Sequence, residues 1–151
     1  MTGGVAVIAL GNRFRGDDGV GPLIADRLRA VSSGIAIVEG VDDSLAIINA
    51  WDDRALAVVV DAAASGAPPG TLHRRDLGRA PLPRELARCS SHGLGLAEAV
   101  ELAGVLDRLP ARLVIYAVEA ADFTPGASLS PEVTAAADVA TRQIMAELTD
   151  A

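Results

Sequence analysis

The sequence feature that most limits the possible folds lies near the start of the chain. Residues 5–10 are a continuous run of β-branched and aliphatic residues, which Gly11 and Asn12 end. Such a run is typical of a strand that is buried on both faces, as in a parallel sheet. Beyond a glycine-rich loop, apolar residues recur at helical spacing at Val20, Leu23, Ile24, Leu28 and Val31. The stretch therefore predicts a strand, a sharp loop and a helix that packs one face on the sheet.

The rest of the chain repeats this alternation of strand and helix. Strands are predicted at residues 35–39, 55–60 and 113–118, with a possible antiparallel edge strand at 71–75. The apolar sides of the later helices are expected at Leu45, Ile48 and Trp51, at Leu96, Ala99, Val100, Ala103 and Leu106, and over residues 133–148. The order predicts an α/β fold, a three-layer α/β/α sandwich around a mostly parallel twisted sheet. A chain of 151 residues is expected to form a single domain over residues 1–151.

Two of the predicted helices begin at residues that favour helix starts. Residues 40–44, Gly-Val-Asp-Asp-Ser, have the composition of a turn followed by an N-cap. Ser130, Pro131 and Glu132 offer a capping hydroxyl, a proline at the first helical position and an acid in the first turn. We therefore expect Ser130 to cap the last helix.

The charge and cysteine content exclude several classes of protein. The chain carries 20 acidic and 13 basic residues, a net charge of −7, without the basic stripe that nucleic-acid backbones require. Cys89 is the single cysteine, which rules out an internal disulfide and is compatible with a reducing compartment. The sequence shows neither a secretory signal nor an apolar run near the ~20 residues that span a bilayer. We expect a soluble, cytoplasmic protein that neither binds nucleic acid nor inserts into a membrane.

Three chemically active groups are expected at one edge of the predicted sheet. Asp17 or Asp18 follows the first strand, Asp61 follows the third, and His92 precedes a helix. Ligands bind beyond the carboxyl ends of the strands in open α/β sheets. Two carboxylates and one imidazole could hold a divalent metal and leave positions open for water or substrate. Acids and histidines in such places are also common as helix caps and solvated charges, so both interpretations stay open.

Other motifs give weaker hypotheses. The glycines between residues 11 and 21 match neither a dinucleotide fingerprint nor a P-loop, and the two carboxylates there would repel a phosphate. Cys89, three residues before His92, leaves a cysteine hydrolase as an alternative, although a lone cysteine is more commonly an inert thiol. His73 is expected to be solvated on the edge strand. The tripeptide at residues 15–17, Arg-Gly-Asp, is interpreted as an accidental match to an adhesion motif.

Three motifs in this order resemble those of one enzyme family. They are Gly11-Asn12 followed by Asp17-Asp18-Gly19-Val20-Gly21, then Val59-Val60-Asp61-Ala62, then Ser91-His92-Gly93-Leu94-Gly95-Leu96. Together they resemble the hydrogenase maturation endopeptidases over essentially the whole chain. The resemblance implies an α/β/α protease that removes a C-terminal peptide from the large-subunit precursor of a nickel-iron hydrogenase after nickel has been installed. It also implies that Asp18, Asp61 and His92 bind the metal, which we expect the precursor to present rather than the protease to hold permanently.

One turn departs from the pattern of that family. Many members have a Gly-Gly-Thr type of turn after the second strand, whereas residues 40–44 here are Gly-Val-Asp-Asp-Ser. That turn is implicated in handling the substrate, so the resemblance does not identify the cognate precursor. The departure also leaves an alternative function, a non-catalytic nickel-sensing or assembly factor that docks on the same precursor. Hydrolysis through a metal-activated water or through a carboxylate general base both stay open.

Overall fold

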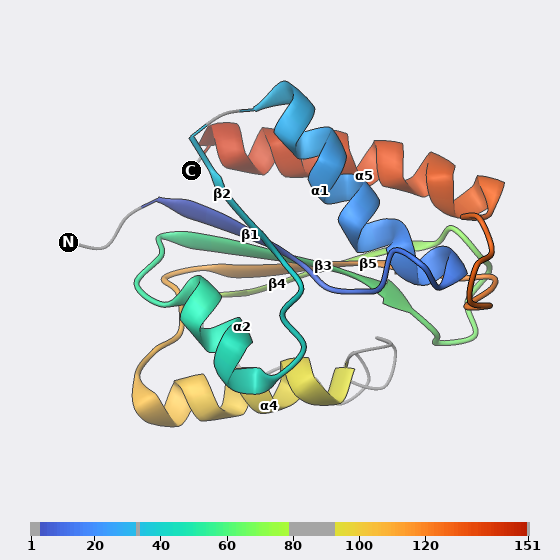
Figure 1. Ribbon diagram of the computed structural model, residues 1–151. Coiled ribbons are helices and arrows are strands. Elements are labelled where there is room, and N and C mark those ends of the chain that lie inside the picture. The colour runs from blue at the N-terminus through green and yellow to red at the C-terminus, as the bar shows by residue number, and fades with distance from the viewer. Residues whose placement is uncertain (1–3, 33, 79–92, 151) are drawn as a thin grey trace.

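The computed structural model describes residues 4–32, 34–78 and 93–150 (Figure 1). Within them five strands form one sheet in the order β2-β1-β3-β5-β4. All neighbours are parallel except β4 and β5, which are antiparallel. The strands are β1 (Val5–Ala9), β2 (Ala36–Glu39), β3 (Leu56–Ala63), β4 (Leu72–Gly78) and β5 (Leu113–Glu119). The predicted parallel sheet and its antiparallel edge strand are both confirmed.

Helices cover the two faces of the sheet, as the predicted sandwich requires (Figure 1). On one face lie α1 (Val20–Val31) and α5 (Pro131–Asp150), and on the other lie α2 (Ser44–Trp51) and α4 (Gly93–Leu106). The 3-10 turn η1 (Gly16–Gly19) leads into α1. None of the helices in the described ranges is long and apolar enough to cross a membrane.

The apolar strands are continuous because each side of the sheet has its own core. In β1, Val7 and Ala9 belong to the core under α1 and α5, whereas Ile8 belongs to the core under α2 and α4. Alternate residues of a strand point to opposite faces, so a strand between two helix layers needs apolar residues at every position. The unbroken run at residues 5–10 is therefore explained by burial on both sides.

One glycine allows the first helix to lie close to the sheet. A Cβ atom built on Gly21 of α1 would lie 2.3 Å from the carbonyl oxygen of Leu10. No side chain fits at that distance, so Gly21 sets how closely α1 approaches the end of β1. The glycine-rich loop thus serves packing as well as the turn.

Several sequence predictions about helix ends were wrong. Val31, Leu45 and Leu106 were expected to face the core but are exposed. Each lies at or next to an end of its helix, beyond the part that packs on the sheet. Apolar residues at helical spacing therefore continue past the last buried position of the helix. Ser130 was expected to cap α5, but its hydroxyl donates to the Asp17 carboxylate instead. The predicted cap of α2 is confirmed, since the Asp43 carboxylate accepts the N–H of Ala46 at 2.8 Å.

Candidate active site

The two adjacent acids of the first loop have different environments. The Asp17 carboxylate is fully buried and accepts the backbone N–H groups of Ala121 at 2.7 Å, Asp122 at 3.0 Å and Ser130 at 2.7 Å. The Ser130 hydroxyl donates to the same carboxylate. With its oxygens occupied in this way, Asp17 anchors the segment between β5 and α5. Because it is buried, the Arg-Gly-Asp tripeptide offers no accessible carboxylate.

Asp18 instead lines an open cleft of about 550 Å³ at the carboxyl end of β1. Only 1% of the residue is exposed, and its Oδ2 accepts the backbone N–H of Asn12 at 2.8 Å. The 3-10 turn η1 that carries Asp18 also contacts β3. Of the two candidate acids in this loop, Asp18 is therefore the one that lines the cleft.

Gly11 fixes the position of Asp18 in a way that the sequence analysis missed. Gly11 has a φ of +120°, which L side chains rarely adopt. A Cβ atom at this position would lie 2.1 Å from the backbone carbonyl oxygen of Asp18. The chain turns so tightly after β1 that Asp18 returns against Gly11. The Gly-Asn pair at the strand end was the available signal.

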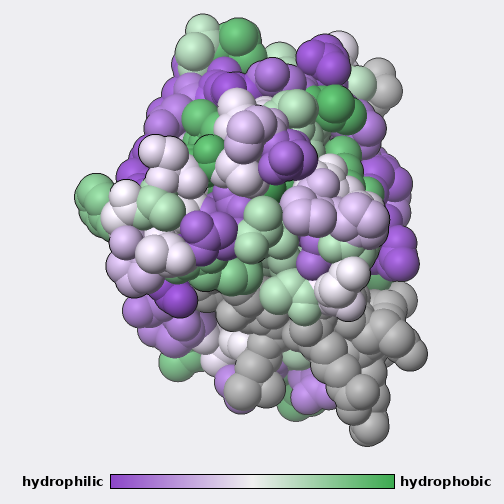
Figure 2. Space-filling view, turned by 90° about the vertical axis from the view of Figure 1, so that its right-hand side faces the viewer, coloured by the Kyte–Doolittle hydropathy of each residue, from purple (hydrophilic) through white to green (hydrophobic). Residues whose placement is uncertain are grey.

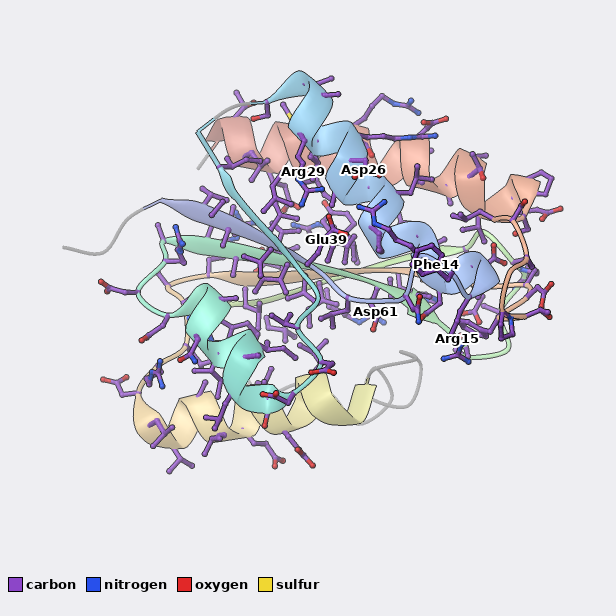
Figure 3. All side chains as sticks on the ribbon, viewed as in Figure 1. Phe14, Arg15, Asp26, Arg29, Glu39 and Asp61 are labelled. Carbon is purple, nitrogen blue, oxygen red and sulfur yellow. The ribbon has the colours of Figure 1, made fainter. Side chains whose placement is uncertain are left out.

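Asp61 was predicted in a loop after the third strand, and that placement was wrong. The strand β3 continues through Asp61 to Ala63, and Asp61 pairs in register with Ala117 of β5. Asp61 is fully buried, and its Oδ1 accepts the N–H of Ala62 at 2.7 Å. Ala57 and Val59, at the same parity along β3, belong to the core under α2 and α4. Alternation therefore places Asp61 on the α2 and α4 side of the sheet (Figure 3).

His92, the third predicted ligand, lies outside the described residues, as does Cys89. The next residue, Gly93, begins α4, at the end of that helix layer nearest to the carboxyl ends of the parallel strands (Figure 1). Asp61 faces the same layer. Among the described residues, no group of three or more His, Cys, Asp and Glu side chains could hold a metal. The three-ligand site of Asp18, Asp61 and His92 therefore stays a prediction.

A network of ion pairs holds one wall of the cleft. The Arg13 guanidinium contacts the carboxylates of Asp26 at 2.7 Å and of Glu39 at 2.8 Å, which joins the first loop to α1 and to the end of β2 (Figure 3). Arg29 contacts both acids as well. The hydrogen bond to Asp26 raises the pKa of Arg13, and the same contact lowers the pKa of Asp26. Arg13 therefore stays charged and fixes the loop.

The turn that departs from the family pattern also lines the cleft. Gly40, Val41 and Asp42 line the cleft together with Asp18. Asp42 is exposed, whereas Asp43 is engaged as the cap of α2. Only one of the two consecutive acids therefore faces the cleft.

His73 was predicted to be solvated, and this was wrong. Its side chain is 22% exposed, and its Nε2 lies 3.1 Å from Oε1 of Glu119, a residue that is 2% exposed. Glu119 also accepts the Ser65 hydroxyl at 2.5 Å and the Ser65 N–H at 2.7 Å. Burial raises the pKa of Glu119, but hydrogen bonds from Ser65, His73 and the N–H of Gly66 outweigh it and hold the pKa below its usual value. No spacing in the sequence indicates this cluster, because it joins β4, β5 and the loop after β3.

Known proteins resemble this chain in sequence and in fold. The chain is 26% identical over 133 residues to the hydrogenase expression/formation protein HupD from Thiocapsa roseopersicina, an alignment that covers 85% of this chain but only 60% of that protein. The hydrogenase maturating endopeptidase HybD from E. coli has the same fold, with a TM-score of 0.82, 22% identity and coverage of 97% and 93% of the two chains. The NiFe hydrogenase maturation protease HybD from Thermococcus kodakarensis gives a TM-score of 0.76 at 23% identity, with coverage of 96% and 99%.

The sequence pattern of one family matches most of the chain. That pattern spans residues 25–147, which include β2 to β5, Asp61 and most of α5. The predicted resemblance is thereby confirmed, and the chain belongs to the hydrogenase maturation protease family.

Proposed function

We propose that this protein is an endopeptidase that removes a C-terminal peptide from the large-subunit precursor of a nickel-iron hydrogenase. Family membership supports a maturation protease, and the relatives in T. roseopersicina and T. kodakarensis carry the names of hydrogenase proteins. The structural observation that carries the proposal is the pair of buried acids Asp18 and Asp61. They belong to the loop after β1 and to the end of β3, two parallel strands that pair directly.

The donor set suits a metal ion that arrives with the substrate. Carboxylate oxygens and an imidazole nitrogen bind borderline divalent ions such as nickel. In the proposal, Asp18, Asp61 and His92 occupy vacant coordination positions on the nickel that the precursor already holds. The peptide bond is then held at the cleft only when nickel is present, which would make cleavage a test of metal insertion.

Hydrolysis also needs a base for the attacking water. A carboxylate within hydrogen-bond reach of that water can accept its proton, and Asp18 is the buried acid that lines the cleft. Glu39 also lines the cleft, but its carboxylate is ion-paired with Arg13. The proposal therefore gives Asp18 two tasks, to bind the nickel that the substrate holds and to accept a proton from the attacking water. It places the reaction in the cytoplasm, with which the single cysteine is compatible.

The direct test compares nickel-loaded and nickel-free precursor. The purified protein is incubated with each, and the released C-terminal peptide is measured by mass spectrometry. We expect release from the loaded precursor alone. Stable binding of the loaded precursor without release would contradict the protease function and support the non-catalytic assembly factor.

A further inference from the structure

One aromatic side chain is exposed beside the candidate site. The chain has two Phe, one Trp and one Tyr, of which Trp51 and Tyr116 are buried and Phe123 packs against the core. Phe14 is 76% exposed and lines the same cleft as Asp18. Single exposed apolar residues are common on protein surfaces, so exposure alone does not indicate a function.

The backbone of Phe14, in contrast, is held on both sides. Its N–H donates to the Asn12 side chain at 2.8 Å, and its carbonyl oxygen accepts the N–H of Gly126 at 2.7 Å. The N–H of Arg15 donates to the Asn12 carbonyl oxygen at 3.2 Å, which closes a tight turn. The ring is thus presented on a fixed backbone. Binding of a partner to this ring therefore costs little conformational entropy of the loop.

Arg15, the next residue, carries a charge that the fold does not use. Its side chain is exposed and lines the cleft, and the guanidinium makes no hydrogen bond or ion pair within the described part of the chain. Arg13, two residues earlier, is by contrast paired with two acids. Asp42 is exposed and lines the same cleft, as does Asp18. The cleft is therefore positive at Arg15 and negative towards Asp18 and Asp42, in a chain whose net charge is −7.

We propose that Phe14 and Arg15 are the docking site for the precursor segment next to the cleaved bond. Phe14 contacts an apolar side chain of that segment, and Arg15 pairs with a neighbouring carboxylate, while the metal-bearing part lies towards Asp18. The inference rests on the proposed function, whose site it deepens by naming the chemistry of the substrate. The cleft has room for a few side chains rather than a domain, which suits an extended peptide.

The surrounding surface supports a small anchor rather than a broad apolar interface. Figure 2 shows the face beyond the carboxyl ends of the strands, and in its coloured part hydrophobic residues are scattered among hydrophilic ones. On such a face, binding energy concentrates in a few aromatic and arginine side chains. Phe14 and Arg15 are consecutive residues of the loop between β1 and α1 (Figure 3). They are two side chains of this kind at the rim of the cleft.

The test measures the affinity for nickel-loaded precursor and its cleavage by wild type, Phe14→Ala and Arg15→Glu. Val105→Ala and Arg142→Glu are the matched controls, because both residues are exposed on other elements, α4 and α5. We expect the Kd and KM of each loop variant to rise about tenfold or more, with kcat within about twofold of wild type. The controls should match wild type. Equal melting temperatures exclude misfolding, since neither loop side chain is buried.

A second variant tests the charge pairing itself. Acidic residues in the C-terminal segment of the precursor are replaced by Lys, one at a time. At one position, the replacement should weaken binding to wild type and restore binding to Arg15→Glu. Unchanged Kd and KM in Phe14→Ala and Arg15→Glu would overturn the docking site and leave the protease function standing. Wild-type protein that binds the precursor but releases no peptide would overturn the protease function, and the Kd values would still decide the docking site.

Discussion

The carboxylate of Asp17 accepts the backbone N–H of Ser130 at 2.7 Å, across 113 residues of sequence. This bond joins η1 to the start of α5. The same carboxylate also accepts the N–H groups of Ala121 and Asp122. The neighbouring Asp18 lines the cleft instead. One acid of the pair therefore maintains the fold, while the other lines the cleft in which we propose that the chemistry takes place.

Substitution of Asp17 should mainly reduce stability. Asp17→Asn places an amide NH₂ against backbone N–H donors and leaves buried donors without an acceptor. Hydrogen bonds to a buried charge contribute more than neutral ones, so we expect the free energy of unfolding to fall by about 3 kcal/mol. Urea unfolding checks this value. If the urea midpoint of Asp17→Asn equals that of wild type, the fold does not need the hydrogen bonds to Asp17.

Substitution of the two site acids should reduce activity rather than stability. Asp18→Asn and Asp61→Asn keep an oxygen for the N–H groups of Asn12 and Ala62 and remove a buried charge. We expect melting temperatures no lower than wild type, together with loss of precursor cleavage, as at sites that keep unfavourable charges for function. Cys89→Ala should cleave normally. A clear fall in melting temperature with normal cleavage would identify the acids as structural.

The tight turn after β1 predicts a strong effect of a small substitution. Gly11→Ala forces a Cβ atom towards the Asp18 carbonyl oxygen and strains a backbone with positive φ. We expect a loss of at least about 2 kcal/mol in the free energy of unfolding. Gly104→Ala is the control, because Gly104 lies in α4 with ordinary space around it, and the change should stabilise by about 0.5–1 kcal/mol. Equal effects of the two substitutions would contradict the close contact.

The buried Glu119 predicts a specific pH dependence of stability. Its pKa is lower in the folded protein than in the unfolded chain, so the stabilisation is present above pH 4.5 and is lost as the pH falls below it. Glu119→Gln keeps the shape but removes the charge that Ser65 and His73 contact. Urea unfolding at pH 6 and pH 3.5 should show wild type losing more stability than Glu119→Gln. Parallel losses would show that Glu119 does not titrate in this range.

The sheet and its layers could be predicted from sequence because they follow from local patterns. Residues 5–10 and 113–118 are unbroken apolar runs, and burial on both faces is the physical reason for such runs. Helix ends were less predictable, since Val31 and Leu106 continue the apolar spacing after the helix has left the core. Asp61 was placed after β3 because the apolar run 55–60 stops there, but the strand continues through it to Ala63.

The separate roles of Asp17 and Asp18 could not be predicted, because they depend on contacts far apart in sequence. The partners of Asp17 lie more than 100 residues away, and nothing near the Asp-Asp pair indicates them. The same holds for His73, whose partner Glu119 is 46 residues away. The motif similarity selected Asp18, and the structure supplies a physical reason, the cleft that Asp18 lines.

In the proposed function, Asp18, Asp61 and His92 contact nickel held by the precursor. Nickel X-ray absorption of the loaded precursor, recorded alone and in rapidly frozen mixture with the protein, tests this contact directly. We predict that wild type adds oxygen or nitrogen ligands to the nickel, that Asp18→Asn and Asp61→Asn add fewer, and that Phe14→Ala adds the same ones at a higher protein concentration. An unchanged nickel spectrum, in a mixture where the precursor is bound, would show that these three residues do not contact the metal.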